Sequence, residues 1–179
     1  MSKQPRGFSL VELSIVLVIL GLLVGGVLSG QSLIRAAELR SVTADYSRYV
    51  AAISSFRDKY FALPGDMANA GSFWGVDTTA NCDWASSTAG TGTTTCNGDG
   101  DGRIIVNYTS PSNEPFRSWQ HLASAGLVEG SYNGLCSPCW PGSAGGAVPG
   151  QNVPKSRISN AGWTLYSFGT MNVAENSFF

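Results

Sequence analysis

The stretch that decides the fold runs from Gly7 to Leu28 and reads GFSLVELSIVLVILGLLVGGVL. Between Glu12 and Arg35 the chain has 22 residues without a charge. A helix that rises about 1.5 Å per residue spans about 33 Å over this length, slightly more than the hydrocarbon core of a bilayer. The sequence therefore predicts one membrane-spanning helix at the start of the chain.

The carboxylate of Glu12 separates three interpretations of this segment. A cleaved secretory signal or a plain membrane anchor would fit the basic start, with Lys3 and Arg6, and the apolar run. Neither explains Glu12, because a carboxylate at the membrane end of an apolar run is costly and marks a functional site. The third interpretation gives this carboxylate a partner.

The run Gly7-Phe8-Ser9-Leu10-Val11-Glu12, with the apolar residues after it, resembles the N-terminal signature of type IV prepilins and type II secretion pseudopilins. The resemblance implies that a membrane prepilin peptidase cleaves after Gly7 and methylates the new amino group of Phe8. It also implies that Glu12 faces the Phe8 amine of a neighbouring subunit during filament assembly. In an apolar filament core, a carboxylate opposite an ammonium recovers much of its desolvation cost.

A second pattern follows Arg35, where apolar residues recur at alternating spacings of three and four. They are Leu39, Val42, Tyr46, Tyr49, Ile53, Phe56 and Tyr60. This stripe predicts that the helix continues and docks on its own head domain, and the run from Leu63 to Asp66, with Pro64 and Gly65, is predicted to end it. A free coiled coil is the weaker alternative because aromatic residues dominate the stripe.

The chain is thus divided into a leader (1–7), a transmembrane or filament-core helix (8–35), the amphipathic half of the same helix (36–62) and a head (63–179) with a loop-rich region at 66–103. The predicted fold class is α+β, and the resemblance implies a pilin fold, with the long helix packed on a small antiparallel sheet and long disulfide-bonded loops. A short helix is predicted over 115–125, with Phe116, Trp119 and Leu122 facing inward. Strands are predicted at 104–106, 127–128 and 163–168.

Four cysteines lie beyond the membrane segment, where the topology predicts an oxidising compartment: Cys82, Cys96, Cys136 and Cys139. Disulfides are the first interpretation. A Cys82–Cys96 bond would close a threonine-rich loop and stabilise the fold by about 3 kcal/mol in the chain-entropy model. A Cys136–Cys139 bond would make a tight ring, although the sequence leaves the pairing open. A single Cys-x-x-Cys is a weak signal for zinc or for a redox motif.

A glycine-rich segment, NGDGDGRI at 97–104, places oxygen side chains at alternate positions, as in loops that wrap calcium. The predicted ligands are the side chains of Asn97, Asp99 and Asp101 and the backbone carbonyl of Arg103. A full EF-hand is excluded because Tyr108 stands where the twelfth-position glutamate belongs, so Glu114 or a distant aspartate would complete the shell. The alternative is a turn whose aspartates cap backbone amides.

Charge and motif content argue against two other classes of protein. Residues 1–60 carry seven basic and four acidic side chains and residues 61–179 carry four and eight, so no strongly basic surface indicates a nucleic-acid partner. The chain has one histidine, His121, and no hydrolase, P-loop or zinc-protease motif, so no enzyme is predicted. His121 is expected to be a hydrogen-bonded surface or edge residue. Three tryptophans in loops, Trp74, Trp84 and Trp140, are expected to pack against the head rather than to bind a sugar or a partner.

The resemblance implies a structural subunit of a type IV pilus, assembled through its N-terminal helix. Its partners would be copies of itself, other pilins, the prepilin peptidase and the inner-membrane assembly machinery. The subunit would cross the inner membrane once, with its head in the periplasm, and then leave the cell in the pilus. A pseudopilin in a periplasmic filament of a type II secretion system is the alternative, and a membrane-anchored adhesion or binding protein that never polymerises is the lesser one.

Overall fold

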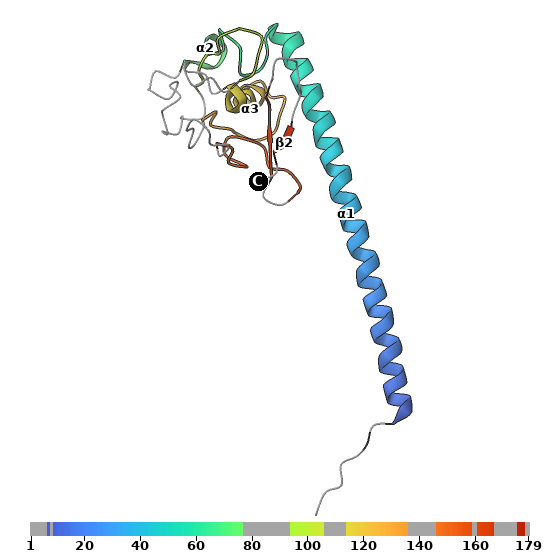
Figure 1. Ribbon diagram of the computed structural model, residues 1–179. Coiled ribbons are helices and arrows are strands. Elements are labelled where there is room, and N and C mark those ends of the chain that lie inside the picture. Colours follow the sequence, from blue (N-terminus) through green and yellow to red (C-terminus); the bar gives the residue numbers. More distant parts are fainter. Residues whose placement is uncertain are drawn as a thin grey trace, which may run out of the picture. The chain divides into compact units, whose positions relative to one another are not determined.

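The structure is a computed structural model that describes residues 7, 9–76, 94–105, 114–135, 146–158 and 161–166, and the backbone of 175–177. Its elements are α1 (Leu10–Tyr60), α2 (Gly71–Trp74), α3 (Glu114–Ser124), β1 (Gly162–Thr164) and β2 (Glu175–Ser177), shown in Figure 1. The chain forms two compact units, Met1–Ser41 and Val42–Phe179.

The first unit is the apolar part of α1. Every leucine, isoleucine and valine from Leu10 to Ile34 is at least half exposed, from 50% at Leu20 to 89% at Leu10. Among the described residues, α1 is the one helix long and apolar enough to cross a membrane, judged by length and composition. A continuous apolar surface of this size requires lipid or protein to cover it. The predicted long N-terminal helix is therefore confirmed, and it suggests a single membrane anchor.

The second unit begins with the last part of α1, which docks through its aromatic stripe. The buried residues of α1 are Tyr49, Ala52, Ile53 and Phe56. The Tyr49 ring meets the Trp119 ring edge to face at 4.9 Å between centroids, and it meets Trp163 in the same way at 5.5 Å. Val42, earlier in the predicted stripe, also packs against the core, while Tyr46 is 41% exposed. Within this unit the docked face therefore follows the predicted stripe, with Tyr46 at its edge.

At the centre of the head lies α3, which corresponds to the helix predicted over 115–125. Phe116, Trp119 and Leu122 are buried, as the sequence predicts. Burial extends further, because every residue from Glu114 to Leu122 is buried. Helix α3 is therefore an internal helix, and its polar side chains need partners inside the head.

The described sheet is a single antiparallel pair, in which Trp163 of β1 stands opposite Asn176 of β2. Strand β1 begins the segment predicted as a strand at 163–168 but ends at Thr164; residues 167–168 lie outside the described part. The strands predicted at 104–106 and 127–128 are wrong for Ile104, Ile105, Leu127 and Val128, because these residues adopt no strand; Val106 lies outside the described part. Ile104 and Val128 are nevertheless buried, so their apolar character reflects burial in loops and not strand period.

Backbone contacts join the residues directly after α2 to the segment around Thr95. Val76 and Thr95 form an isolated bridge, and the Thr95 N–H donates to the Gly75 carbonyl at 2.9 Å. Of the four cysteines, the structure describes Cys96, which is buried and disulfide-bonded. The other three lie outside the described residues, so the predicted pairing stays a prediction.

The residue directly after α1 has a left-handed backbone conformation. Phe61 has φ of 54°, a left-handed conformation that favours glycine, and its N–H donates to the Arg57 carbonyl at 2.8 Å. Its side chain is 93% exposed and gains little from packing. The left-handed conformation costs a residue with a Cβ about 1–2 kcal/mol. The backbone strain at the helix end is thus not balanced by burial of this ring.

We expect the Phe61→Gly variant to be more stable than the natural chain by about 1 kcal/mol, because glycine adopts the left-handed conformation without this cost. Denaturant unfolding of the full chain in a neutral detergent, followed by tryptophan fluorescence, measures the difference. Phe61→Ala is the matched control, since it removes the same ring and keeps a Cβ. An equal gain in both variants would show that the exposed ring, and not the backbone, causes the effect.

Candidate functional site

The start of α1 is built as a helix cap that involves Glu12. The Ser9 Oγ accepts a hydrogen bond from the Val11 N–H at 3.3 Å, and the Glu12 Oε2 accepts one from the Ser9 N–H at 2.9 Å. This reciprocal arrangement is a capping box, which satisfies backbone donors that the first helical turn leaves open. Glu12 therefore has a partner within its own chain.

Sequence reasoning missed this partner, although the signal was present. Ser9 and Glu12 stand in the Ser-x-x-Glu spacing typical of a capping box ahead of an apolar run. Of the predicted cleavage residues, Gly7 is exposed, and Phe8 lies outside the described residues. Capping explains why a carboxylate suits this position, and it leaves the charge available for a second role because a carboxylate accepts several hydrogen bonds.

In the head, the side chains of the segment predicted to wrap calcium accept hydrogen bonds from backbone amides. The Asn97 Oδ1 accepts the Gly71 N–H at 2.8 Å, and the Asp101 Oδ1 accepts the Arg103 N–H at 2.8 Å. Asp99 also bonds within the loop, to the Asp101 N–H at 3.2 Å. These bonds match the alternative interpretation of a turn with capping side chains.

Asp99 also belongs to a different group, which the structure brings together from three segments. Asp66 follows α1, Asp99 lies in the glycine-rich loop, and Glu114 is the first residue of α3. One carboxylate oxygen of each lies within 4.8 Å of the others. We call these three residues the carboxylate cluster. The sequence named Glu114 or a distant aspartate as the residue that would complete the shell, and the cluster contains Glu114 and Asp66, whereas the predicted ligand Asp101 is not part of it.

Close backbone approach holds the glycine-rich loop against the turn after α1. The Gly98 N–H donates to the Met67 carbonyl at 2.9 Å, and the Gly100 N–H donates to the Asp66 carbonyl at 3.0 Å. A Cβ on Gly98 would collide with the Asp66 backbone. Glycine is therefore required where the two segments touch.

Burial controls the electrostatics of the cluster. Asp66 is 4% exposed and Glu114 is fully buried, while Asp99 is exposed. Burial raises the pKa of Asp66 to about 6, with the neighbouring Asp99 and Asp101 adding to the rise. Burial likewise raises the pKa of Glu114 to about 7, and the charges of Asp99 and Asp66 raise it further. The site is thus suited to hold a proton or a cation.

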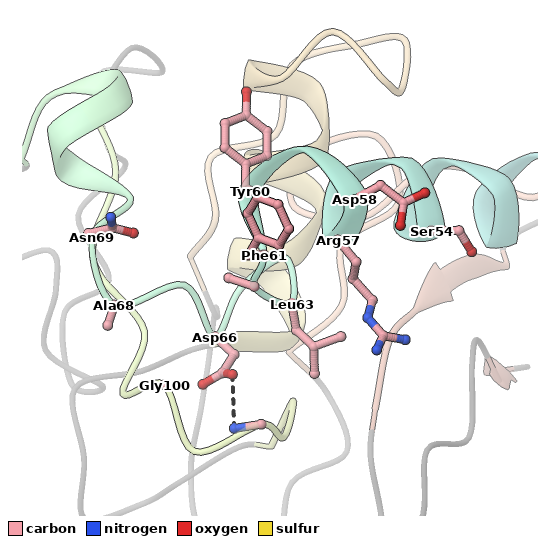
Figure 2. Close-up of a pocket in the computed structure, with 12 residues that line it drawn as sticks. Ser54, Arg57, Asp58, Tyr60, Phe61, Leu63, Asp66, Ala68, Asn69 and Gly100 are labelled. Atoms are coloured by element: carbon pink, nitrogen blue, oxygen red, sulfur yellow. Dashed lines mark hydrogen bonds between the residues drawn. The ribbon is translucent and has the colours of Figure 1, made fainter.

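Beside Asp66 a groove of about 870 Å³ opens in the head. Figure 2 shows Arg57, Phe61 and Leu63 around it, and the hydrogen bond that Asp66 accepts from the Gly102 N–H at 3.0 Å. Gly100 and Gly102 of the glycine-rich loop line the same groove. Solvent therefore reaches the Asp66 side of the cluster.

A buried histidine holds two backbone segments near the cluster through hydrogen bonds. His121 Nδ1 accepts the Gly65 N–H at 2.9 Å, and Nε2 lies 3.0 Å from Thr95 Oγ1. Because Nδ1 is an acceptor, the neutral ring carries its hydrogen on Nε2. The expectation that His121 is hydrogen-bonded is correct, but the surface position is wrong, because it is fully buried.

Trp74 packs on the core as predicted, with its ring centroid 5.4 Å from those of Tyr60 and His121. Trp84 and Trp140 lie outside the described residues.

Comparison with known proteins gives a match for the N-terminal segment. Residues 2–28 match the family model of the prokaryotic N-terminal methylation motif, the prepilin-type signature of type IV pilins and pseudopilins. No curated protein and no solved structure matches the chain. The resemblance seen in the sequence is thus confirmed for this segment, and the head must be interpreted from its own geometry.

We expect the head to lose stability as the pH falls below about 6.5, through His121. Burial, with the nearby Arg117 charge, lowers the pKa of His121 to about 3, so below pH 6.5 the unfolded chain binds a proton that the folded chain does not. The contribution is complete above pH 6.5 and falls by up to about 1.4 kcal/mol per pH unit towards pH 3.

Denaturant unfolding of the natural chain and of His121→Asn between pH 4.5 and 7.5, in one detergent, measures this contribution. Asn offers an acceptor to the Gly65 N–H without the titration, and the opposite contributions of Asp66 and Glu114 are common to both proteins. The natural chain should lose stability relative to the variant as the pH falls. Parallel pH profiles would contradict the neutral buried histidine.

Proposed function

We propose that this chain, which carries the prepilin-type methylation signature at residues 2–28, is a structural subunit of a type IV pilus. The signature makes it a type IV pilin-like or pseudopilin-like precursor, and it is the observation that carries the proposal. The exposed apolar surface of α1 adds support, because membrane anchoring and burial among other subunits would both cover it.

In this proposal, a prepilin peptidase cleaves after Gly7 and methylates Phe8. The new amino group then lies one residue before Ser9, at the start of the capped helix. Glu12 keeps its bond to the Ser9 N–H and pairs with the Phe8 amine of a neighbouring subunit. An unpaired carboxylate in an apolar filament core is strongly disfavoured, so the pairing selects one axial register between subunits.

The composition of the head and its disulfide-bonded cysteine favour a pilus subunit over a pseudopilus subunit. The head is rich in glycine and turns and carries a disulfide-bonded cysteine, features suited to an extracellular surface. The proposed partners are copies of the same chain, other pilins and the inner-membrane assembly machinery. Before assembly the head faces the periplasm, and the protein acts by polymerisation rather than by catalysis.

Imaging of filaments sheared from cells, with mass spectrometry of their N-terminus, tests this function. Long filaments whose subunits begin with methylated Phe8 are the expected result. A cleaved protein that stays within the envelope would instead assign it to a pseudopilus. An intact Met1 in cells without filaments would exclude both assignments.

Glu12 variants separate charge pairing from helix capping. We expect Glu12→Gln to insert into the membrane and retain the cap, because glutamine also serves this position in a capping box, but to lose filament assembly at least tenfold. Glu12→Ala should also insert into the membrane but should lose both the helix cap and filament assembly. Immunoblots of the membrane and sheared fractions measure insertion and assembly. Normal filament yield from Glu12→Gln would show that capping, and not charge, is the role of Glu12.

A further inference from the structure

The carboxylate cluster concentrates acidic groups without a cation to balance them. Asp66, Asp99 and Glu114 each place an oxygen within 4.8 Å of the other two. Between two described residues, a salt bridge joins Arg48 to Asp45, and none joins a described lysine or arginine to the cluster. Ionised carboxylates at such separations repel one another.

A second observation points to a ligand inside the cluster. Each buried carboxylate has one oxygen fixed by a backbone amide in or directly after the glycine-rich loop: the Gly102 N–H donates to Asp66 Oδ2 and the Ile105 N–H donates to Glu114 Oε2, both at 3.0 Å. The other oxygens, Asp66 Oδ1 and Glu114 Oε1, are buried and have no hydrogen-bond partner among the described residues. Buried polar atoms are nearly always satisfied, so two orphan oxygens in one cluster need a partner.

We propose that Asp66, Asp99 and Glu114 bind one calcium ion. Calcium takes oxygen ligands at about 2.3–2.6 Å, so two oxygens on a common ion lie no further apart than about 5 Å, as the cluster oxygens do. Magnesium keeps several waters and is usually held by one or two carboxylates in a strict octahedron. Three carboxylates from irregular segments suit calcium better.

Access and remaining ligands are consistent with this ion. Asp99 is exposed, and Asp66 lines the groove of Figure 2 together with Gly100 and Gly102. An ion can thus enter from solvent, and water can supply the ligands that three carboxylates do not. The bound ion would join the turn after α1, the glycine-rich loop and the first turn of α3. This inference rests on the head alone and does not depend on the proposed function.

The test uses the full chain in dodecyl maltoside micelles at a fixed pH of 8, after treatment with EGTA and removal of the chelator. Equilibrium dialysis with radioactive calcium measures stoichiometry, and thermal unfolding measures the effect on Tm. We expect one calcium per chain and a rise in Tm of about 5 °C in 10 mM calcium chloride. Magnesium chloride at the same concentration, and potassium chloride at the same ionic strength, should produce a much smaller rise.

Single substitutions distinguish the cluster from the glycine-rich loop by itself. Glu114→Gln and Asp66→Asn keep an oxygen for the Ile105 and Gly102 amides and should abolish calcium binding. Asp99→Asn, at an exposed position that tolerates change, should weaken binding at least tenfold. Asp101→Asn is the matched control, because it makes the same change in the same loop outside the cluster and should leave binding unaltered.

Three results would overturn the proposal. One is the absence of calcium binding by the natural chain at millimolar concentration. Another is magnesium raising the Tm as much as calcium. The third is loss of binding in Asp101→Asn with retention in Glu114→Gln, which would place the ion in the loop alone. If Glu114→Gln and Asp66→Asn fail to fold, Asp101→Asn decides between the two sites, because it should keep calcium binding by the cluster and lose calcium binding by the loop alone.

Discussion

The stacking of Phe56 on the neutral His121 ring joins the segments that build the head. The two rings lie 6.3 Å apart and nearly parallel, one on α1 and the other on α3. The nitrogens of His121 then fix Gly65, in the turn after α1, and Thr95, two residues before the glycine-rich loop. A charged imidazolium could not make these contacts, because Nδ1 must accept the hydrogen bond from the Gly65 N–H and burial disfavours the charge. One buried side chain thus sets the positions of three backbone segments.

The polar groups of α3 fall into two sets with opposite character. Ser118 lies within hydrogen-bond distance of the Pro64 and Glu114 carbonyls, and Gln120 bonds to Thr95 and to the Thr94 carbonyl. These groups are hydrogen-bonded, as expected for a buried polar network. Glu114, only one turn away, keeps a buried oxygen without a described partner, and so does the indole nitrogen of Trp119. Glu114 differs from Trp119 in that Asp66, its neighbour in the cluster, also has such an oxygen.

The sequence predicted what depends on local patterns. The apolar run, the three-four stripe around Tyr49 and Phe56, and the amphipathic pattern of Trp119 and Leu122 each carry a period, and periods determine helices. Short apolar pairs such as Ile104 and Ile105 carry no period, so burial in a loop was mistaken for a strand.

The cluster could not be predicted as a set, because Asp66, Asp99 and Glu114 are far apart in the sequence. Asp99 stood out because its loop has a local pattern, whereas Asp66 and Glu114 become neighbours only through the fold. The capping box at Ser9 and Glu12 is local, and its Ser-x-x-Glu spacing is visible in the sequence.

The bridge between Val76 and Thr95 has a consequence for how the head tolerates change. Together with the bond from the Thr95 N–H to the Gly75 carbonyl, it holds two points of the backbone side by side that are far apart in the sequence. Closing a connection between two fixed points costs only about 0.6 kcal/mol more for each doubling of its length. A change in the number of residues between Val76 and Thr95 is therefore expected to have a small effect on the free energy of folding.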